Sequence, residues 1–152
     1  MPEPLMSEPL MSEPLTGGCL CGEIRYAVDV AVEWLAACYC TDCQRRTSAA
    51  GSINAVVPAS AFRITRGETR VFTKQADSGN ALHRHFCGTC GSWIYNPMGG
   101  DATQVVLKAG TFDSHDGMRI ALNLWTSRRP AWAPLDSTLP CHEKNIVQTR
   151  QD

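Results

Sequence analysis

The 152-residue chain has the length and composition of one globular domain with a core of its own. Apolar residues make up 43%, charged residues 19%, and the formal net charge is −1, so bulk charge gives no basis for binding a polyanion. No apolar run approaches the ~20 residues that cross a bilayer, and the acidic, proline-rich N-terminus does not resemble a secretory signal. We therefore expect a cytoplasmic protein that binds neither nucleic acid nor membranes.

The N-terminal segment is a tandem repeat. Residues 1–15 read MPEPL-MSEPL-MSEPL, with a proline in every unit and no apolar periodicity. Such a composition is typical of disorder. We predict a disordered tail over residues 1–16, a folded domain over residues 17–145 and a short C-terminal tail over residues 146–152.

The domain reads as short strands separated by turn residues. Alternating or β-branched runs predict strands over residues 23–30, 52–57, 62–65, 69–73, 81–86, 92–96, 104–111 and 118–125. Arg66-Gly67-Glu68 predicts a hairpin between the third and fourth of these strands. One short helix is predicted over residues 41–48 and a helical turn over residues 58–61, whereas the proline-rich segment 128–145 is expected to be extended and irregular. The fold class is therefore mainly β with little helix.

Eight cysteines stand out in a chain that we expect to reside in a reducing compartment. They are Cys19, Cys21, Cys38, Cys40, Cys43, Cys87, Cys90 and Cys141. Close cysteine pairs in such proteins are more typical of metal ligands than of disulfides. We therefore predict metal sites.

Four of these cysteines form two pairs with complementary geometry. Cys87-Gly88-Thr89-Cys90-Gly91 is a zinc-knuckle turn, in which two thiolates point at one ion and the glycines permit a tight turn. Cys19 and Cys21 precede a predicted strand, where alternate residues point the same way. The two pairs together predict a closed, structural four-thiolate zinc site.

The segment CYCTDC (residues 38–43) offers three thiols to a second metal. Its fourth ligand has three candidate sources: Cys141, a histidine, or an exchangeable water or substrate thiolate, the last being the pattern of catalytic zinc. The candidate histidines are His83, His85, His115 and His142. The residue types alone do not choose among these alternatives.

The order of these motifs resembles the glutathione-dependent formaldehyde-activating enzyme family, which includes relatives of centromere protein V. The resemblance is carried by GCLCGEIRY (residues 18–26), CYCTDCQRR (38–46) and RHFCGTCGSWIY (84–95), and downstream by AGTFD (109–113), LW (124–125) and RPAW (129–132). It extends over nearly the whole predicted domain. Tyr39 and Asn123 depart from the family pattern, because the family commonly has histidine at both positions.

The resemblance implies a β-tent fold of short antiparallel sheets stapled by two zinc ions. By position, Cys19, Cys21, Cys87 and Cys90 match the structural site, and Cys38, Cys40 and Cys43 match the catalytic site. The implied activity is that of a carbon–sulfur lyase working in the direction of synthesis. A thiol such as glutathione would add to formaldehyde or a related small aldehyde, as in S-hydroxymethylglutathione synthesis.

Cations and aromatic residues near the second site complete this hypothesis. Arg45 and Arg46 directly follow Cys43 and are expected to bind the anionic thiol substrate. Arg84, Arg128 and Arg129 are further candidates for its carboxylates, Asp42 for proton transfer, and Trp93, Trp125 and Trp132 for the pocket wall.

Two rival functions stay open. One is a non-catalytic zinc scaffold with both metals structural, and the other is a thiol-redox protein in which the clustered cysteines change oxidation state. The oligomeric state is not predicted.

Overall fold

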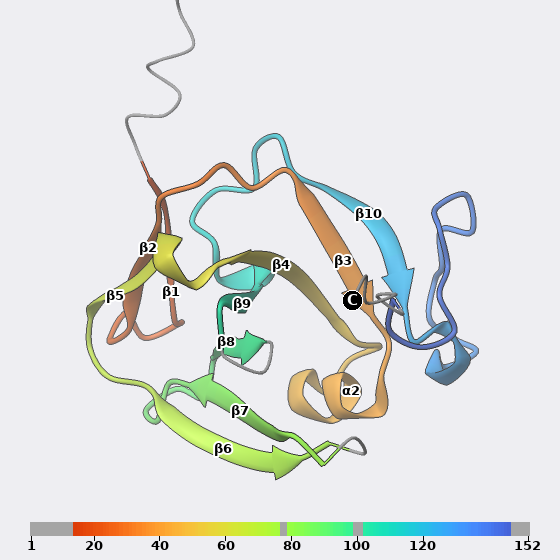
Figure 1. The fold of residues 1–152 in the computed structure, drawn as a ribbon, viewed down its shortest axis with the longest axis horizontal. Helices are drawn as coiled ribbons and strands as arrows, with labels where there is room; N and C mark the ends of the chain where they lie inside the picture. The colour runs from red at the N-terminus through yellow and green to blue at the C-terminus, as the bar shows by residue number, and fades with distance from the viewer. Residues whose placement is uncertain (1–13, 77–78, 99–101, 147–152) are drawn as a thin grey trace, which may run out of the picture.

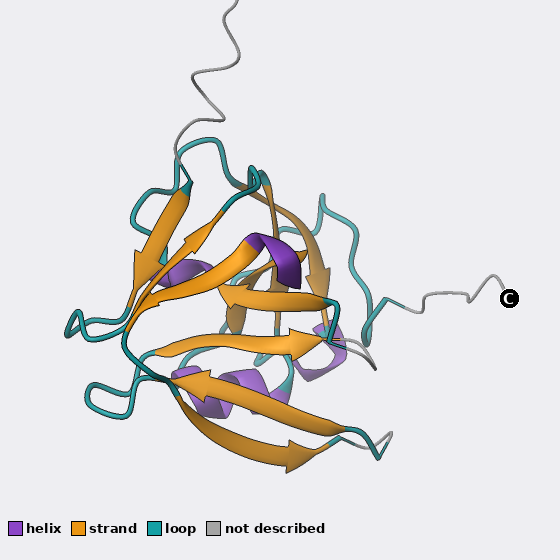
Figure 2. Ribbon diagram, turned by 60° about the vertical axis from the view of Figure 1, so that its left-hand side comes forward, coloured by secondary structure: helices purple, strands orange, loops and turns teal. Residues whose placement is uncertain are grey.

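The computed structural model describes residues 14–76, 79–98 and 102–146 as a mainly β protein. A small sheet has the strand order β1-β2-β5 and a large sheet the order β10-β3-β4-β9-β8-β7-β6 (Figures 1 and 2). The small sheet consists of β1 (Leu15–Gly18), β2 (Arg25–Val28) and β5 (Phe62–Arg66). The large sheet consists of β3 (Trp34–Cys38), β4 (Ser52–Pro58), β6 (Arg70–Gln75), β7 (Ala81–Phe86), β8 (Trp93–Met98), β9 (Gln104–Lys108) and β10 (Arg119–Leu124).

The helical elements are short. The helix α2 (Thr41–Thr47) follows β3, and three single turns are η1 (Ala59–Ala61), η2 (Ala109–Thr111) and η3 (Thr126–Arg128). Figure 1 places α2 beside β7 and below the ends of β3 and β4. Among the described residues, no helix combines the length and apolar character needed to cross a bilayer.

The main apolar core lies between the small sheet and one face of the large sheet. Tyr26 and Val28 of β2 pack there with Ala55, Val57 and Leu107, which are almost completely buried. Because side chains alternate along a strand, Asn54 and Lys108 project to the other face of β4 and β9, toward α2. The two faces of the large sheet therefore differ: one is apolar, and the other carries buried polar groups.

The predicted hairpin at Arg66-Gly67-Glu68 is wrong. Gly67 does make a turn with φ +80°, and a Cβ there would meet the Glu23 carbonyl oxygen at 2.2 Å. However, β5 pairs with β2 and β6 pairs with β7, so the chain passes from one sheet to the other at this turn. The half-buried Phe62 and Ile64 pack against the core, whereas β6 is exposed, and this difference in burial separates the two strands.

The N-terminal boundary of the folded domain and the direction of one strand pair also differ from those predicted. Leu15 and Thr16 belong to β1, where Leu15 pairs with Val28 and packs against the core, so the predicted tail boundary at residue 16 falls inside a strand. Residues 1–13 and 147–152 lie outside the described residues, so the disorder of the N-terminal repeat and the C-terminal tail stay predictions. The large sheet is antiparallel except for β3 and β10, which run parallel.

Candidate metal centres

The four-cysteine cluster consists of Cys19, Cys21, Cys87 and Cys90, whose sulfurs all lie within 4.8 Å of one another. The Cys19 and Cys21 sulfurs are 3.6 Å apart, and those of Cys21 and Cys87 are 3.7 Å apart. Four sulfurs at the corners of a tetrahedron with Zn–S bonds of about 2.3 Å lie about 3.8 Å apart. A disulfide would need about 2.05 Å, and the cysteines are free. The spacing therefore fits a tetrahedral zinc ion.

Turns on either side of the four-cysteine cluster position its sulfurs. The Ile24 amide donates to the Cys19 sulfur at 3.2 Å, and the Cys90 amide donates to the Cys87 sulfur at 3.5 Å. Gly22 and Gly91 both have φ +83°, the left-handed conformation that glycine adopts without strain. Hydrogen bonds from main-chain amides stabilise thiolates, so these turns are built for metal-bound sulfur.

Ser92 joins the two halves of the four-cysteine cluster. Its hydroxyl accepts from the Leu20 amide at 3.1 Å and lies 3.3 Å from the Cys90 sulfur. Hydrogen bonds from the Ser92 hydroxyl and amide lower the pKa of Cys90 to about 5. Cys90 is therefore ready to bind a metal as a thiolate near neutral pH.

The three-cysteine cluster consists of Cys38, Cys40 and Cys43, whose sulfurs also lie within 4.8 Å of one another. Cys38 ends β3, and Cys40 caps α2 by accepting from the Cys43 amide at 3.3 Å. Cys38 and Cys43 are buried, whereas Cys40 is partly exposed. The strand end and the helix start thus bring the three sulfurs together.

Proton sharing within the three-cysteine cluster singles out Cys43. Hydrogen bonds from the Cys38 and Cys40 thiols lower the pKa of Cys43, and the charge of Lys108 and the Ser52 hydroxyl act in the same direction. The neighbouring thiols and burial raise the pKa of Cys38. Cys43 is therefore the first of the three to become a thiolate.

No further ligand joins the three-cysteine cluster from the described residues, since no described histidine, cysteine or carboxylate lies within the same 4.8 Å. Arg84 projects toward α2, so His83 and His85 point to the other face of β7, where they contact Thr73 and Thr69. Cys141 is exposed and lies 3.4 Å from the Asn123 amide nitrogen. Among the described residues, neither a histidine nor Cys141 supplies a fourth ligand.

Asp42 takes part in ion pairs that hold α2 against β6 and β7. Its carboxylate accepts from Lys74 Nζ at 2.7 Å and from Arg84 Nη2 at 2.9 Å. The Arg84 side chain is only 8% exposed, and its Nε and Nη1 have no partner among the described residues. Asp42 and Arg84 therefore position the helix that carries Cys43.

The arginines after Cys43 have different surroundings. The Arg46 guanidinium lies 5.0 Å from the Trp93 ring centre and 5.3 Å from that of Phe86, and burial together with the charge of Arg84 lowers its pKa. Arg45 is exposed on α2. Of these two, only Arg46 packs on the aromatic side chains beside the cluster.

The predicted aromatic wall is only partly assembled. Trp93 is buried against Cys38 and Cys43, and Trp125 packs at the edge of the same group. Trp132 is 73% exposed. The Arg128 carbonyl accepts from Gln44, and Arg129 donates to the Ala133 carbonyl, so these two residues help to attach the C-terminal segment.

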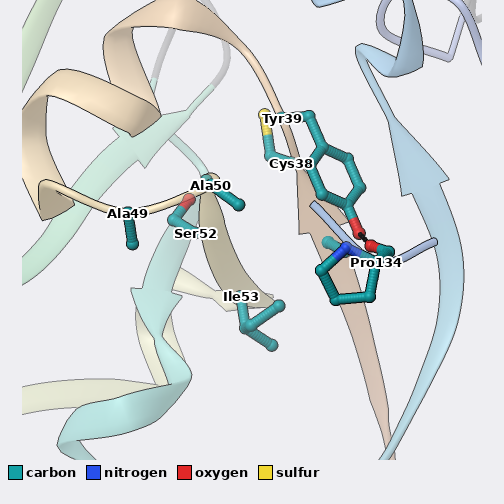
Figure 3. A pocket seen from close by; sticks show the side chains of 9 residues that line it. Cys38, Tyr39, Ala49, Ala50, Ser52, Ile53 and Pro134 are labelled. Atoms are coloured by element: carbon teal, nitrogen blue, oxygen red, sulfur yellow. Dashed lines mark hydrogen bonds between the residues drawn. The ribbon is translucent and has the colours of Figure 1, made fainter. Parts of the chain in front are cut away.

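A pocket of about 180 Å³ lies at the end of β3, with Cys38, Tyr39, Ser52 and Pro134 among its lining residues. Figure 3 shows the Tyr39 ring and Pro134 side by side, with Ala49, Ala50 and Ser52 across from them. The Tyr39 hydroxyl donates to the Pro134 carbonyl at 3.1 Å. The lining residues Ala37 and Ile53 are paired next to the Cys38–Ser52 pair, so their side chains project to the opposite face of the sheet.

The comparison with protein families shows to which family the chain belongs. The sequence profile of the family described as glutathione-dependent formaldehyde-activating enzyme matches residues 14–128. The chain belongs to this family. The region matched to the glutathione-dependent formaldehyde-activating enzymes contains both cysteine clusters and stops short of Cys141.

A solved structure of a Rhodobacter sphaeroides protein, determined as a structural genomics target, has a similar fold. It is 21% identical to this chain, with a TM-score of 0.50 over 65% of this chain and 88% of its own. At this identity the similarity concerns the fold alone.

Three buried polar residues beside the three-cysteine cluster were missed in the sequence analysis: Ser52, Asn54 and Lys108. Ser52 donates to the Cys43 sulfur at 3.1 Å, and Lys108 donates to Asn54 at 2.8 Å. The only sequence signal was a lysine directly after the apolar run VVL. That Lys108 lies beside Asn54 becomes evident only from the pairing of β4 with β9.

Proposed function

We propose that the three-cysteine cluster is an open zinc site at which a thiol adds to a small aldehyde, the synthetic direction of a carbon–sulfur lyase reaction. The observation that carries the proposal is a cluster of three sulfurs that no fourth described ligand completes. Membership of the glutathione-dependent formaldehyde-activating enzyme family supports glutathione as the thiol and formaldehyde as the aldehyde. The four-cysteine cluster is proposed to be structural.

Cys38, Cys40 and Cys43 would hold the metal, since thiolates are preferred ligands of zinc. A zinc ion bound there supplies positive charge that favours a substrate thiolate and polarises a carbonyl. In the reaction, the thiol loses its proton, its sulfur forms a bond to the carbonyl carbon, and the carbonyl oxygen takes up a proton. Atoms and charges balance without an oxidant.

The chain contributes the surroundings of this reaction. Arg46 lies on the aromatic residues next to the cluster, and Arg45 is exposed on the same helix. Both are proposed to attract the carboxylates of a glutathione-like thiol. Asp42 is already bound by Lys74 and Arg84, which favours a positioning role for it over proton transfer.

The test is to follow adduct formation from glutathione and formaldehyde by NMR, with substoichiometric zinc-loaded protein. We expect the adduct to reach the same equilibrium faster with the protein than without it. The variant Cys40→Ser should not accelerate adduct formation. Zinc content and metal–sulfur absorption are measured with and without glutathione. The proposal would be contradicted, and a zinc scaffold favoured, if glutathione changes neither of two bound zinc ions per chain and the protein does not accelerate adduct formation. Reversible oxidation of the metal-free cluster would favour the redox alternative.

A further inference from the structure

Buried polar side chains lie under the three-cysteine cluster, in the layer between the large sheet and α2. Ser52 is 6% exposed, Lys108 7% and Asn54 8%. Ser52 is paired with Cys38, and Asn54 is paired with Lys108, on neighbouring strands. A polar layer at this depth is costly unless its groups are bonded to one another or to a charge.

These side chains form a continuous chain of contacts that ends on a cysteine of the cluster. Lys108 Nζ donates to Asn54 Oδ1 at 2.8 Å, and the Ser52 hydroxyl lies 3.1 Å from both Asn54 Oδ1 and the Cys43 sulfur. An ammonium group only donates, so it fixes Asn54 with its oxygen toward Lys108. The Ser52 hydroxyl has one proton, and a negatively charged Cys43 sulfur attracts it more strongly than a neutral amide oxygen does.

The charge of Lys108 needs a partner of opposite sign. Asp42 is bound by Lys74 and Arg84, and Arg84 itself is a second cation close to Lys108. Burial lowers the pKa of Lys108 to about 8, and the three cluster thiolates oppose this shift. Lys108 Nζ also lies 3.6 Å from the centre of the Trp93 ring, which packs against Cys38 and Cys43. The three-cysteine cluster, which Trp93 joins to Lys108, is thus the candidate counter-charge of Lys108.

We propose that Lys108 is a positioning residue of the three-cysteine centre, which balances its thiolate charge and fixes Asn54 beside the Ser52 hydroxyl that contacts Cys43. This inference rests on the proposed function, because it takes the cluster to be a metal centre with an exchangeable fourth ligand. Three thiolates and a divalent ion carry one negative charge, and a substrate thiolate adds a second. Lys108 lowers the cost of that second charge, so the centre favours anionic sulfur over neutral ligands.

The experiment measures metal binding at each cluster separately, in the full chain loaded with Co²⁺, whose thiolate charge-transfer bands report each site. The variant Cys40→Ser, which leaves the four-cysteine cluster intact, assigns the bands of each site by difference. Chelator competition then gives the affinity of each site in Lys108→Met, in the charge-retaining Lys108→Arg, and in Lys144→Met as an exposed-lysine control.

We expect Lys108→Met to weaken Co²⁺ binding at the three-cysteine cluster by about 10- to 100-fold, the usual effect of losing a residue behind the ligands. The thiolate charge-transfer bands of Co²⁺ at this cluster should shift. A higher concentration of glutathione than in the wild type should be needed to perturb them. The four-cysteine bands should be unchanged, which shows that the variant is folded. Lys108→Arg should restore most of the affinity, and Lys144→Met should behave like the wild type.

Ser52→Ala tests the contact chain without changing any charge. We expect it to weaken the same site by less than Lys108→Met does, and the double variant to lose less affinity than the sum of the two effects. Unchanged affinity and bands in Lys108→Met, or equal weakening at both clusters, would overturn the inference. A wild-type chain that binds Co²⁺ only at the four-cysteine cluster would instead overturn the proposed function.

Discussion

The two cysteine clusters use the same sulfur chemistry in different surroundings. In the four-cysteine cluster, turn amides and Ser92 bond the sulfurs, and the set of ligands is complete. Around the three-cysteine cluster, which no fourth ligand among the described residues completes, lie Ser52, the buried Lys108 and Arg46. The two clusters therefore differ in what surrounds their sulfurs, and this difference is the basis for proposing a structural role for the first and substrate binding for the second.

The largest expected effect comes from removing a ligand of the four-cysteine cluster. Cys87 is completely buried, and its cluster ties the turn before β2 to the turn before β8. Structural zinc sites contribute about 10–16 kcal/mol of binding energy to folding. Cys87→Ser should lose the cooperative unfolding transition in thermal circular dichroism, whereas Cys141→Ser, an exposed cysteine outside both clusters, should keep it. A stable, cooperatively folding Cys87→Ser protein would contradict the structural role.

Loss of a ligand from the three-cysteine cluster should affect activity far more than folding. Cys40 is partly exposed and caps the short helix α2. Cys40→Ser is expected to bind one zinc per chain instead of two and to lose thiol addition, whereas its free energy of unfolding should change little, because serine is itself a preferred helix cap. Elemental analysis, NMR kinetics and denaturant unfolding measure these quantities. If Cys40→Ser unfolds as completely as Cys87→Ser, the distinction between the clusters fails.

Removing the ion pairs of Asp42 should have an effect of intermediate size. Asp42→Asn leaves the buried Arg84 without its counter-charge. Because the Asp42 side chain is 29% exposed, we expect a loss of about 1–3 kcal/mol of unfolding free energy in urea titration. Faster amide exchange in α2 and weaker metal binding at the three-cysteine cluster should accompany it.

The matched control for this test is Asp29→Asn, which removes an exposed ion pair with Arg63. Surface pairs contribute about 0–1 kcal/mol, so the control should change little. Equal losses in the two variants would show that Asp42 does not specifically support the second cluster.

The smallest expected effect concerns acid release of metal from the four-cysteine cluster. The Ser92 hydroxyl lowers the pKa of Cys90, so the thiolate persists as the pH falls toward about 5. In Ser92→Ala this pKa rises, and protonation displaces the metal at a higher pH. The midpoint of acid release, followed by Co²⁺ absorption, should move upward at the four-cysteine bands only. A shift at the three-cysteine bands, or a downward shift, would contradict this assignment.

The sequence predicted the two cysteine clusters well because their spacing is local. Cys38, Cys40 and Cys43 lie in one turn of chain, and the two pairs of the other cluster each span a short turn. The helix over residues 41–48 was predicted almost to its observed end at Thr47. Mainly β structure followed from the alternating runs and is confirmed.

Features that depend on pairing between distant strands could not be predicted. The polar neighbours of Cys43 lie on β4 and β9, and only their register brings Lys108 beside Asn54. β3 was missed because its sequence WLAAC runs directly into the cysteine motif and lacks alternation. Asn123, at a position where the family commonly has histidine, is buried and donates to the Asp136 carbonyl at 3.1 Å, an attachment of the C-terminal segment that no motif reveals.

The parallel pairing of β3 with β10 has a consequence for how the second cluster forms. β3 carries Cys38 at its end, and β10 begins only at Arg119. During synthesis, the edge of β3 must stay unpaired until nearly the whole chain has emerged, because loop closure over such a separation precedes the contact. The four-cysteine cluster needs the chain only as far as Cys90. A growing chain can therefore close its first metal centre well before the strand that borders its second is complete.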